Sequence, residues 1–176
     1  MEKVLFSEEQ RFNQWWFRLI MILTLLAVLA PFVTGIYHQV VLKEPFGDNP
    51  MSTQGLVVTG IFSLFTMLFI FLKIFKSKLL TKITADSLLI SFPPFMRKWK
   101  TIAPEEIERY EIRTYRAKRE FGGHGIKRRL RSGQSYTVSG NIGVQLYFKN
   151  GKKLLIGTQR KQAFEYAMRK LMEGEE

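Results

Sequence analysis

The residues that could do chemistry gather in one short segment, FGGHGIKRRLRSGQ, which runs from Phe121 to Gln134. This segment holds four glycines, one histidine and four Lys or Arg residues. Glycines let a backbone approach an anion closely, and cations attract the anion. The same composition also suits a solvated connection between two strands, in which Gly122, Gly123 and Gly125 would have positive φ angles or allow a close backbone approach. The segment therefore raises a choice between phosphate chemistry and simple electrostatic contact.

Catalysis by this segment would need partner residues that the sequence does not supply. A Walker-type phosphate loop has the pattern GxxxxGK[ST] at the start of a helix, and residues 122–127, GGHGIK, do not match it. His124 could act as a base, but the chain has only one other histidine, His38, and the nearest acid is Glu120. The chain has no cysteine, and a metal site needs three or four ligands. We therefore expect no enzymatic activity, no cofactor and no bound metal.

The cations in and before this segment predict an anionic partner. Between Arg113 and Arg131 there are eight Lys or Arg residues and one acid, Glu120. We expect seven of these cations to contact lipid headgroups or other anions: Arg116, Lys118, Arg119, Lys127, Arg128, Arg129 and Arg131. A merely solvated basic surface and a protein partner stay open as alternatives. Nucleic acid is disfavoured, because binding single strands needs aromatic side chains interleaved with the cations.

Two apolar runs upstream predict a membrane anchor. Residues 19–42 contain no Lys, Arg, Asp or Glu, and as a helix they would span about 36 Å, against about 30 Å for a hydrocarbon core. Residues 55–75 form the second predicted transmembrane helix, with Lys73 as its only charge. Residues 43–54, which include two prolines, form the predicted external loop between them. Residues 1–18 form a lead into the first helix, and Ser7 with Gln10 suggests that the lead is helical.

The flanking cations predict how the anchor is oriented. Lys3, Arg11 and Arg18 precede the first helix, whereas the loop between the helices has only Lys43. Four lysines follow the core of the second helix: Lys73, Lys76, Lys78 and Lys82. Because cytoplasmic flanks are enriched in Lys and Arg, we expect a multi-pass protein of the cytoplasmic membrane with both termini in the cytoplasm.

Residues 79–176 predict a separate cytoplasmic domain of α+β class. Seven short strand-like runs are expected, and Asp86-Ser87 and Lys149-Asn150-Gly151 mark two of the turns between them. Apolar residues at helical spacing after Thr158, its expected cap, predict one C-terminal amphipathic helix. Such a helix can cover one end of a small antiparallel barrel. We therefore expect a barrel of the pleckstrin-homology (PH-like) type.

The segments FGGHGI, TVSGNIGVQL and GKKLLIGTQR support this expectation. With them the chain resembles uncharacterised bacterial membrane proteins that have two N-terminal transmembrane helices and a PH-like cytoplasmic domain. The resemblance covers nearly the whole chain, and the Ser139-Gly140-Asn141 turn before Gly143 is its most specific part. It implies a fold and a membrane attachment, and it implies no catalytic residues.

The sequence thus predicts a non-enzymatic module that is anchored in the bilayer and contacts anionic lipid headgroups through its basic loop. The alternative is a scaffold or assembly subunit that binds a membrane protein partner. Both hypotheses use the same domain, and the sequence does not choose between them.

Overall fold

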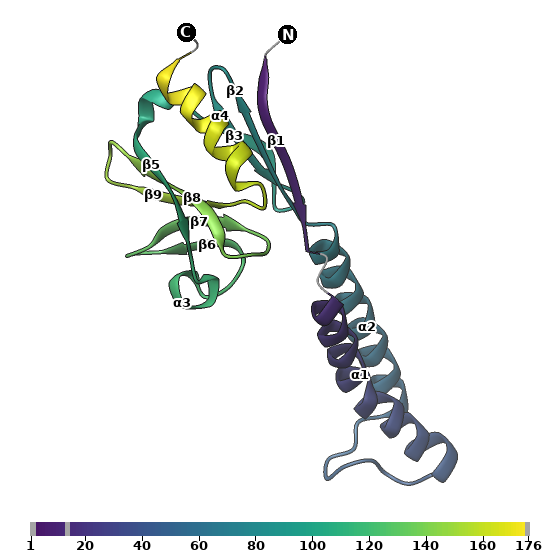
Figure 1. Cartoon of the computed structure of the whole chain (residues 1–176). Helices are drawn as coiled ribbons and strands as arrows, with labels where there is room; N and C mark the ends of the chain where they lie inside the picture. Colours follow the sequence, from purple (N-terminus) through teal and green to yellow (C-terminus); the bar gives the residue numbers. More distant parts are fainter. Residues whose placement is uncertain (1–2, 13–14, 175–176) are drawn as a thin grey trace. The chain divides into compact units, whose positions relative to one another are not determined.

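A computed structural model describes residues 3–12 and 15–174, so residues 1–2 of the predicted lead, residues 13–14 and the last two residues lie outside the description. The chain divides into two compact units (Figure 1). One is helical and covers residues 13–75, and the other combines residues 1–12 with residues 76–176. The α+β unit is therefore discontinuous in sequence, because the helical unit is inserted between its first and second strands.

The helical unit is a hairpin of two long apolar helices. Helix α1 covers Trp15–Tyr37 and continues as the π-helical turn η1, His38–Leu42, while helix α2 covers Thr53–Phe75. Figure 1 shows α1 and α2 side by side. Both helices are long and apolar enough to cross a membrane. The two predicted helices are thus present, and α1 begins four residues before the predicted start at Leu19.

Glycines let the two helices approach each other. Gly35 and Gly60 are buried, and a Cβ added to Gly60 would lie 3.3 Å from the Phe32 ring. A Cβ added to Gly35 would lie 3.1 Å from Leu56. Small residues at a helix interface permit this closeness in lipid. Ala27, Pro31 and Gly35 share one face of α1 at a spacing of four residues, and of these three Gly35 is buried whereas Ala27 and Pro31 are exposed.

In residues 3–12 and 76–174, the α+β unit contains nine strands in two sheets. The four-stranded sheet has the order β1-β2-β3-β4, in which β1 is Val4–Arg11, β2 is Lys78–Thr84, β3 is Leu88–Phe92 and β4 is Met96–Ile102. The five-stranded sheet has the order β5-β8-β9-β7-β6. Its strands are β5 Ile107–Thr114, β6 Gly125–Arg129, β7 Gly133–Thr137, β8 Ile142–Phe148 and β9 Lys153–Gly157. Three helices complete the unit: η2 Pro104–Glu106, α3 Ala117–Phe121 and α4 Lys161–Glu173.

The main core lies where both sheets and α4 contribute side chains. Ile83 and Ile90 come from the first sheet, Val144 and Ile156 from the second, and Phe164 from α4, and all five are buried. Helix α4 lies against β1 and β2 (Figure 1), and the rings of Phe6 and Phe164 are 4.9 Å apart. The amphipathic C-terminal helix is confirmed, as are the turns at Asp86-Ser87 and at Gly151.

The predicted closed barrel is wrong, because the two sheets do not close on each other. The strands are also not all antiparallel, since β7 pairs with β9 in parallel. Two strands, β1 and β6, add to the seven expected. Strand β6 contains Lys127, Arg128 and Arg129 and lies at a sheet edge, so it has no apolar alternation that would reveal it.

The predicted helical lead is also wrong, since residues 4–11 form β1. The segment alternates in burial along its length, with Phe6, Glu8 and Gln10 buried. The Glu8 carboxylate accepts hydrogen bonds from the Thr158 hydroxyl at 2.7 Å and from the Gln159 N–H at 2.8 Å. Tertiary pairing with β2 and these bonds override the local capping pattern. The prediction that Thr158 caps α4 is wrong, because Arg160 occupies the cap position; the Thr158 hydroxyl accepts a hydrogen bond from the N–H of Arg160.

Candidate functional site

The basic segment expected to be a loop is a β-hairpin preceded by a short helix. Phe121 ends α3, β6 and β7 form the two arms, and residues 130–132 connect them. Gly122, Gly123, Gly125 and Gly133 all have positive φ. The conformational role expected of the first three is thereby confirmed, and Gly122 caps α3 in the left-handed conformation.

Alternation along β6 separates the hairpin's cations onto two faces of the sheet. Arg128 pairs with Gln134, on the same face as Tyr136 and Leu154, which belong to the main core. Lys127 and Arg129 lie on the opposite face, which Tyr115, Ala117, Phe121 and Leu155 cover as a second small core. A Cβ added to Gly122 would lie 3.0 Å from Nη2 of Arg129, so this side chain reaches toward α3.

The turn of the hairpin presents an apolar side chain among cations. Leu130 has a relative exposure of 107% and lies between Arg129 and Arg131, which are also exposed. The three cations around α3, Arg116, Lys118 and Arg119, are exposed as well. All seven residues predicted to contact anions are therefore accessible.

Arg113 is held differently from these seven cations. Its Nη2 lies 2.7 Å from Oε2 of Glu120, and its guanidinium also donates to Gln145 Oε1. Burial raises the pKa of Glu120, but hydrogen bonds from Arg113 and from the Arg116 N–H outweigh this effect, so its pKa is lowered. Arg113 and Glu120 thus stabilise the link between β5 and α3 and are not free to bind a ligand.

His124 is packed against a tyrosine and a threonine. Its ring lies 6.4 Å from that of Tyr115, and Nδ1 lies 3.3 Å from Oγ1 of Thr137. Burial lowers the pKa of His124, and burial raises the pKa of Tyr115 to about 12. Both groups are therefore neutral near pH 7. Across residues 3–12 and 15–174 no three His, Cys, Asp or Glu side chains gather as metal ligands.

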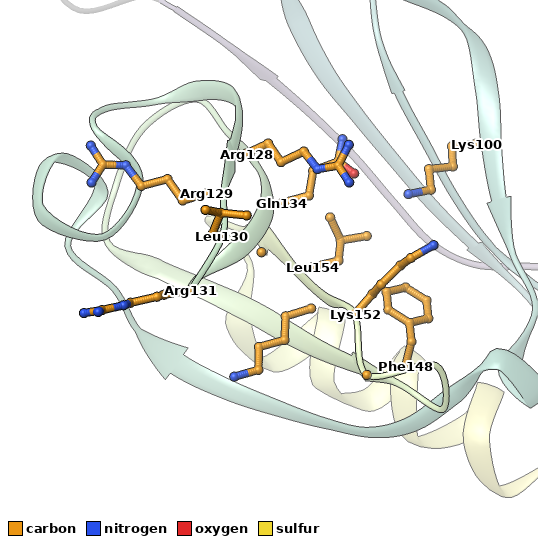
Figure 2. Close-up of a pocket in the computed structure, with 12 residues that line it drawn as sticks. Lys100, Arg128, Arg129, Leu130, Arg131, Gln134, Phe148, Lys152 and Leu154 are labelled. Carbon is orange, nitrogen blue, oxygen red and sulfur yellow. The ribbon is translucent and has the colours of Figure 1, made fainter.

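A pocket with a volume of about 810 Å³ adjoins the core-facing side of the hairpin. Six cations line it, namely Lys100, Arg128, Arg129, Arg131, Lys152 and Lys153, and none of its lining residues is acidic. Figure 2 shows the charged ends of Arg128, Lys100 and Lys152 pointing toward one space, whereas Arg129 and Arg131 point away from it. The apolar side chains of the lining are Phe148 and Leu154, which are buried, and the exposed Leu130.

Three cations of this pocket lie outside the basic segment of the sequence, namely Lys100, Lys152 and Lys153. Lys152 and Lys153 follow the Asn150-Gly151 turn. The sequence shows that these two residues are basic, but it does not show that they lie near the basic hairpin. Lys100 is nearly thirty positions before Arg128 and belongs to the other sheet. Only the packing of the two sheets brings these cations to one pocket.

Strand pairing also constrains how the helical unit is connected. Arg11, at the end of β1, pairs with Lys78, at the start of β2. Strands that pair in one sheet lie on one side of any membrane, so the chain between them must cross an even number of times. The two candidate membrane-spanning helices satisfy this condition.

Comparison with known proteins finds no family model and no curated protein sequence that matches this chain, so its function has to be argued from its own residues.

Proposed function

We propose that this protein is a non-enzymatic module of the cytoplasmic membrane whose α+β domain contacts anionic lipid headgroups through the β6–β7 hairpin. The two helices anchor it, and both termini lie in the cytoplasm. One observation carries the proposal: the fully exposed Leu130 projects from a turn flanked by Arg129 and Arg131.

An apolar side chain surrounded by cations suits the boundary between headgroups and acyl chains. The cations gain about 1 kcal/mol each near an anionic leaflet, and the effect fades within a Debye length of about 10 Å at 0.1 M salt. Transfer of the Leu130 side chain from water to the boundary of the acyl chains also lowers the free energy. Arg116, Lys118 and Arg119 on the preceding segment extend the same basic surface.

A fluorescent label at the hairpin turn tests this contact in the intact chain. The chain has no cysteine, so Leu130→Cys provides a unique attachment point for an environment-sensitive dye. In proteoliposomes we expect blue-shifted emission with 30% phosphatidylglycerol relative to pure phosphatidylcholine, and reversal of the shift at high salt. Lys127→Gln with Arg129→Gln and Arg131→Gln should abolish the shift. A label at exposed Gln162 on α4 is the control.

Equal emission in neutral and anionic vesicles, by protein shown to be folded, would contradict the proposed contact. The alternative, a scaffold that binds a partner protein, would then be favoured, and it would use a different surface of the domain. Strand β4 is an edge of its sheet, and Phe95 and Trp99 beside and on it are exposed. An unpaired edge with exposed aromatic side chains can accept a strand of a partner protein.

A further inference from the structure

Three positively charged side chains converge in the pocket beside the hairpin. The proposed contact between the hairpin and lipid headgroups does not require this convergence. Lys100 comes from β4, Arg128 from β6, and Lys152 from the turn between β8 and β9. Their charged ends point toward a common space in Figure 2. Three cations from three elements thus face one another across the junction of the two sheets.

These cations are not neutralised within the protein. In the part of the chain that the structure describes, Lys100, Arg128 and Lys152 form no ion pair. Lys100 is partly buried, and this burial lowers its pKa. The carboxylate of Glu106 raises that pKa, while the positive charge of Lys152 lowers it. Lys100 therefore experiences both desolvation and repulsion by Lys152, and the negative charge of a bound anion would offset the cost of both.

Sheet geometry explains why Lys100 and Arg128 face the same space. Lys100 lies two residues before the buried Ile102 on β4, so both are on the core-facing side of the first sheet. Arg128 lies two residues after Ile126, whose partner Tyr136 is in the core, so Arg128 is on the core-facing side of the second sheet. The apolar core ends there, and the two cations line its basic rim.

We propose that this pocket binds a phosphate monoester group, with the Arg128 guanidinium as a two-pronged donor and Lys100 and Lys152 as point charges. The inference goes beyond the proposed lipid contact, because a phosphate could occupy the pocket whether or not Leu130 reaches a membrane.

The chemistry of the pocket selects the monoester. A phosphate monoester carries a charge of about −1.5 to −2 at pH 7, whereas a diester carries about −1. Three converging cations therefore favour the monoester more. The planar guanidinium matches two phosphate oxygens, and lysine ammonium groups add charge without a fixed geometry. The volume of about 810 Å³ lies within the range of small-molecule sites, so the phosphate would be one end of a larger molecule.

Titration of the full chain in phosphatidylcholine nanodiscs tests the pocket. The soluble probe is glycerol 3-phosphate, and its diester counterpart glycerophosphoglycerol is the control ligand, with binding measured by isothermal titration calorimetry. We expect saturable binding that is at least about fivefold tighter for the monoester. Lys100→Gln with Lys152→Gln should weaken monoester binding by about tenfold or more.

A charge-matched variant separates the pocket from the general basic field. Lys118→Gln with Lys127→Gln removes two positive charges at exposed positions that do not line the pocket, and it should change monoester affinity by less than about threefold. Thermal unfolding of both variants shows whether each remains folded. Equal weakening by the two folded variants, or equal affinity for the monoester and the diester, would overturn the proposed site.

Lipid composition then distinguishes a membrane source of the phosphate from a soluble one. Phosphatidic acid carries a monoester on the lipid and phosphatidylglycerol a diester, and native mass spectrometry counts the lipids retained. If the pocket reaches headgroups, the wild type retains phosphatidic acid, the Lys100 and Lys152 variant loses it, and soluble probe competes. If the ligand is soluble, glycerol 3-phosphate binds and phosphatidic acid does not compete. Binding of neither ligand overturns the inference.

The two proposals fail separately. If the Leu130 label ignores anionic lipid while glycerol 3-phosphate still binds, the lipid contact of the hairpin is wrong and the pocket stands. If the label responds but the pocket variant matches the wild type in every titration, the contact stands and the pocket does not bind phosphate.

Discussion

At the residue scale, glycines in the basic hairpin decide how closely it packs. Gly133 begins β7 with a φ of +81°, and a Cβ there would lie 2.3 Å from the carbonyl oxygen of Lys153 on β9. Backbone atoms cannot move aside as a flexible side chain can. Gly140 also has a positive φ, +78°, but nothing lies within 4 Å of its added Cβ. A comparison of substitutions at these two positions therefore distinguishes the cost of backbone strain from the cost of a steric clash.

Gly133→Ala should destabilise the protein by about 3 kcal/mol or more, since it adds a backbone clash to left-handed strain. Gly140→Ala should cost only about 1–2 kcal/mol, the cost of the left-handed conformation alone. Thermal or denaturant unfolding of the full chain in detergent measures the difference. Equal destabilisation by the two substitutions would show that the close approach between β7 and β9 is absent.

At the element scale, β1 belongs to the core of the domain although it precedes the membrane helices in sequence. Phe6 is buried against Phe164, and the Gln10 side chain donates to the Gly157 carbonyl at 2.8 Å. With the bonds of Glu8, strand β1 therefore contacts both β2 and the end of β9. The expected domain, residues 79–176, lacks this strand.

The α+β unit should fold without the membrane helices if its two segments are joined directly. In such a chain, residues 3–12 come first, a short Gly-Ser linker follows, and residues 76–174 come last. Residues 79–176 alone should not unfold cooperatively, because losing Phe6 by itself costs about 3–5 kcal/mol against a domain stability of about 5–15 kcal/mol. Circular dichroism during heating compares the cooperativity of unfolding of the joined chain with that of residues 79–176 alone. Within the joined chain, Phe6→Ala should lower the melting temperature strongly and the exposed Val4→Ala only slightly. Cooperative unfolding of residues 79–176 would contradict this role of β1.

At the scale of the whole molecule, the pairing of β1 with β2 and the two candidate spans fit the membrane hairpin that we propose. In that hairpin the pairing requires the domain to lie on one side of the membrane, and the proposed side, which the Lys and Arg bias predicts, is the cytoplasm.

Single cysteines in the cysteine-free chain test this topology. Asp48→Cys, between α1 and α2, should react with a membrane-impermeant maleimide in intact cells. Gln162→Cys on α4 should react only after the cells are opened, because the domain is expected inside. Labelling of both positions in intact cells would contradict the hairpin, and the reverse pattern would contradict the orientation alone.

The sequence by itself determined the features that depend on local composition. Long uncharged runs are recognisable without tertiary contacts, because a hydrocarbon core requires about twenty apolar residues in succession. The Asn150-Gly151 turn and the apolar spacing of α4 are likewise local, and so are the positive φ angles of Gly122 and Gly125. The seven candidate contact residues were found by counting charge, and the structure shows them accessible.

Only the tertiary structure decided what depends on segments distant in sequence. Residues 4–11 carry a helix-capping pattern, yet pairing with β2, about seventy residues later, makes them a strand. Strand β6 is recognisable only by its partner β7, since its side chains are mostly charged. Lys100 meets Arg128 only because two sheets pack together. Non-local pairing outweighs weak local preference in each case, because burial and a full set of backbone hydrogen bonds stabilise more than a single cap does.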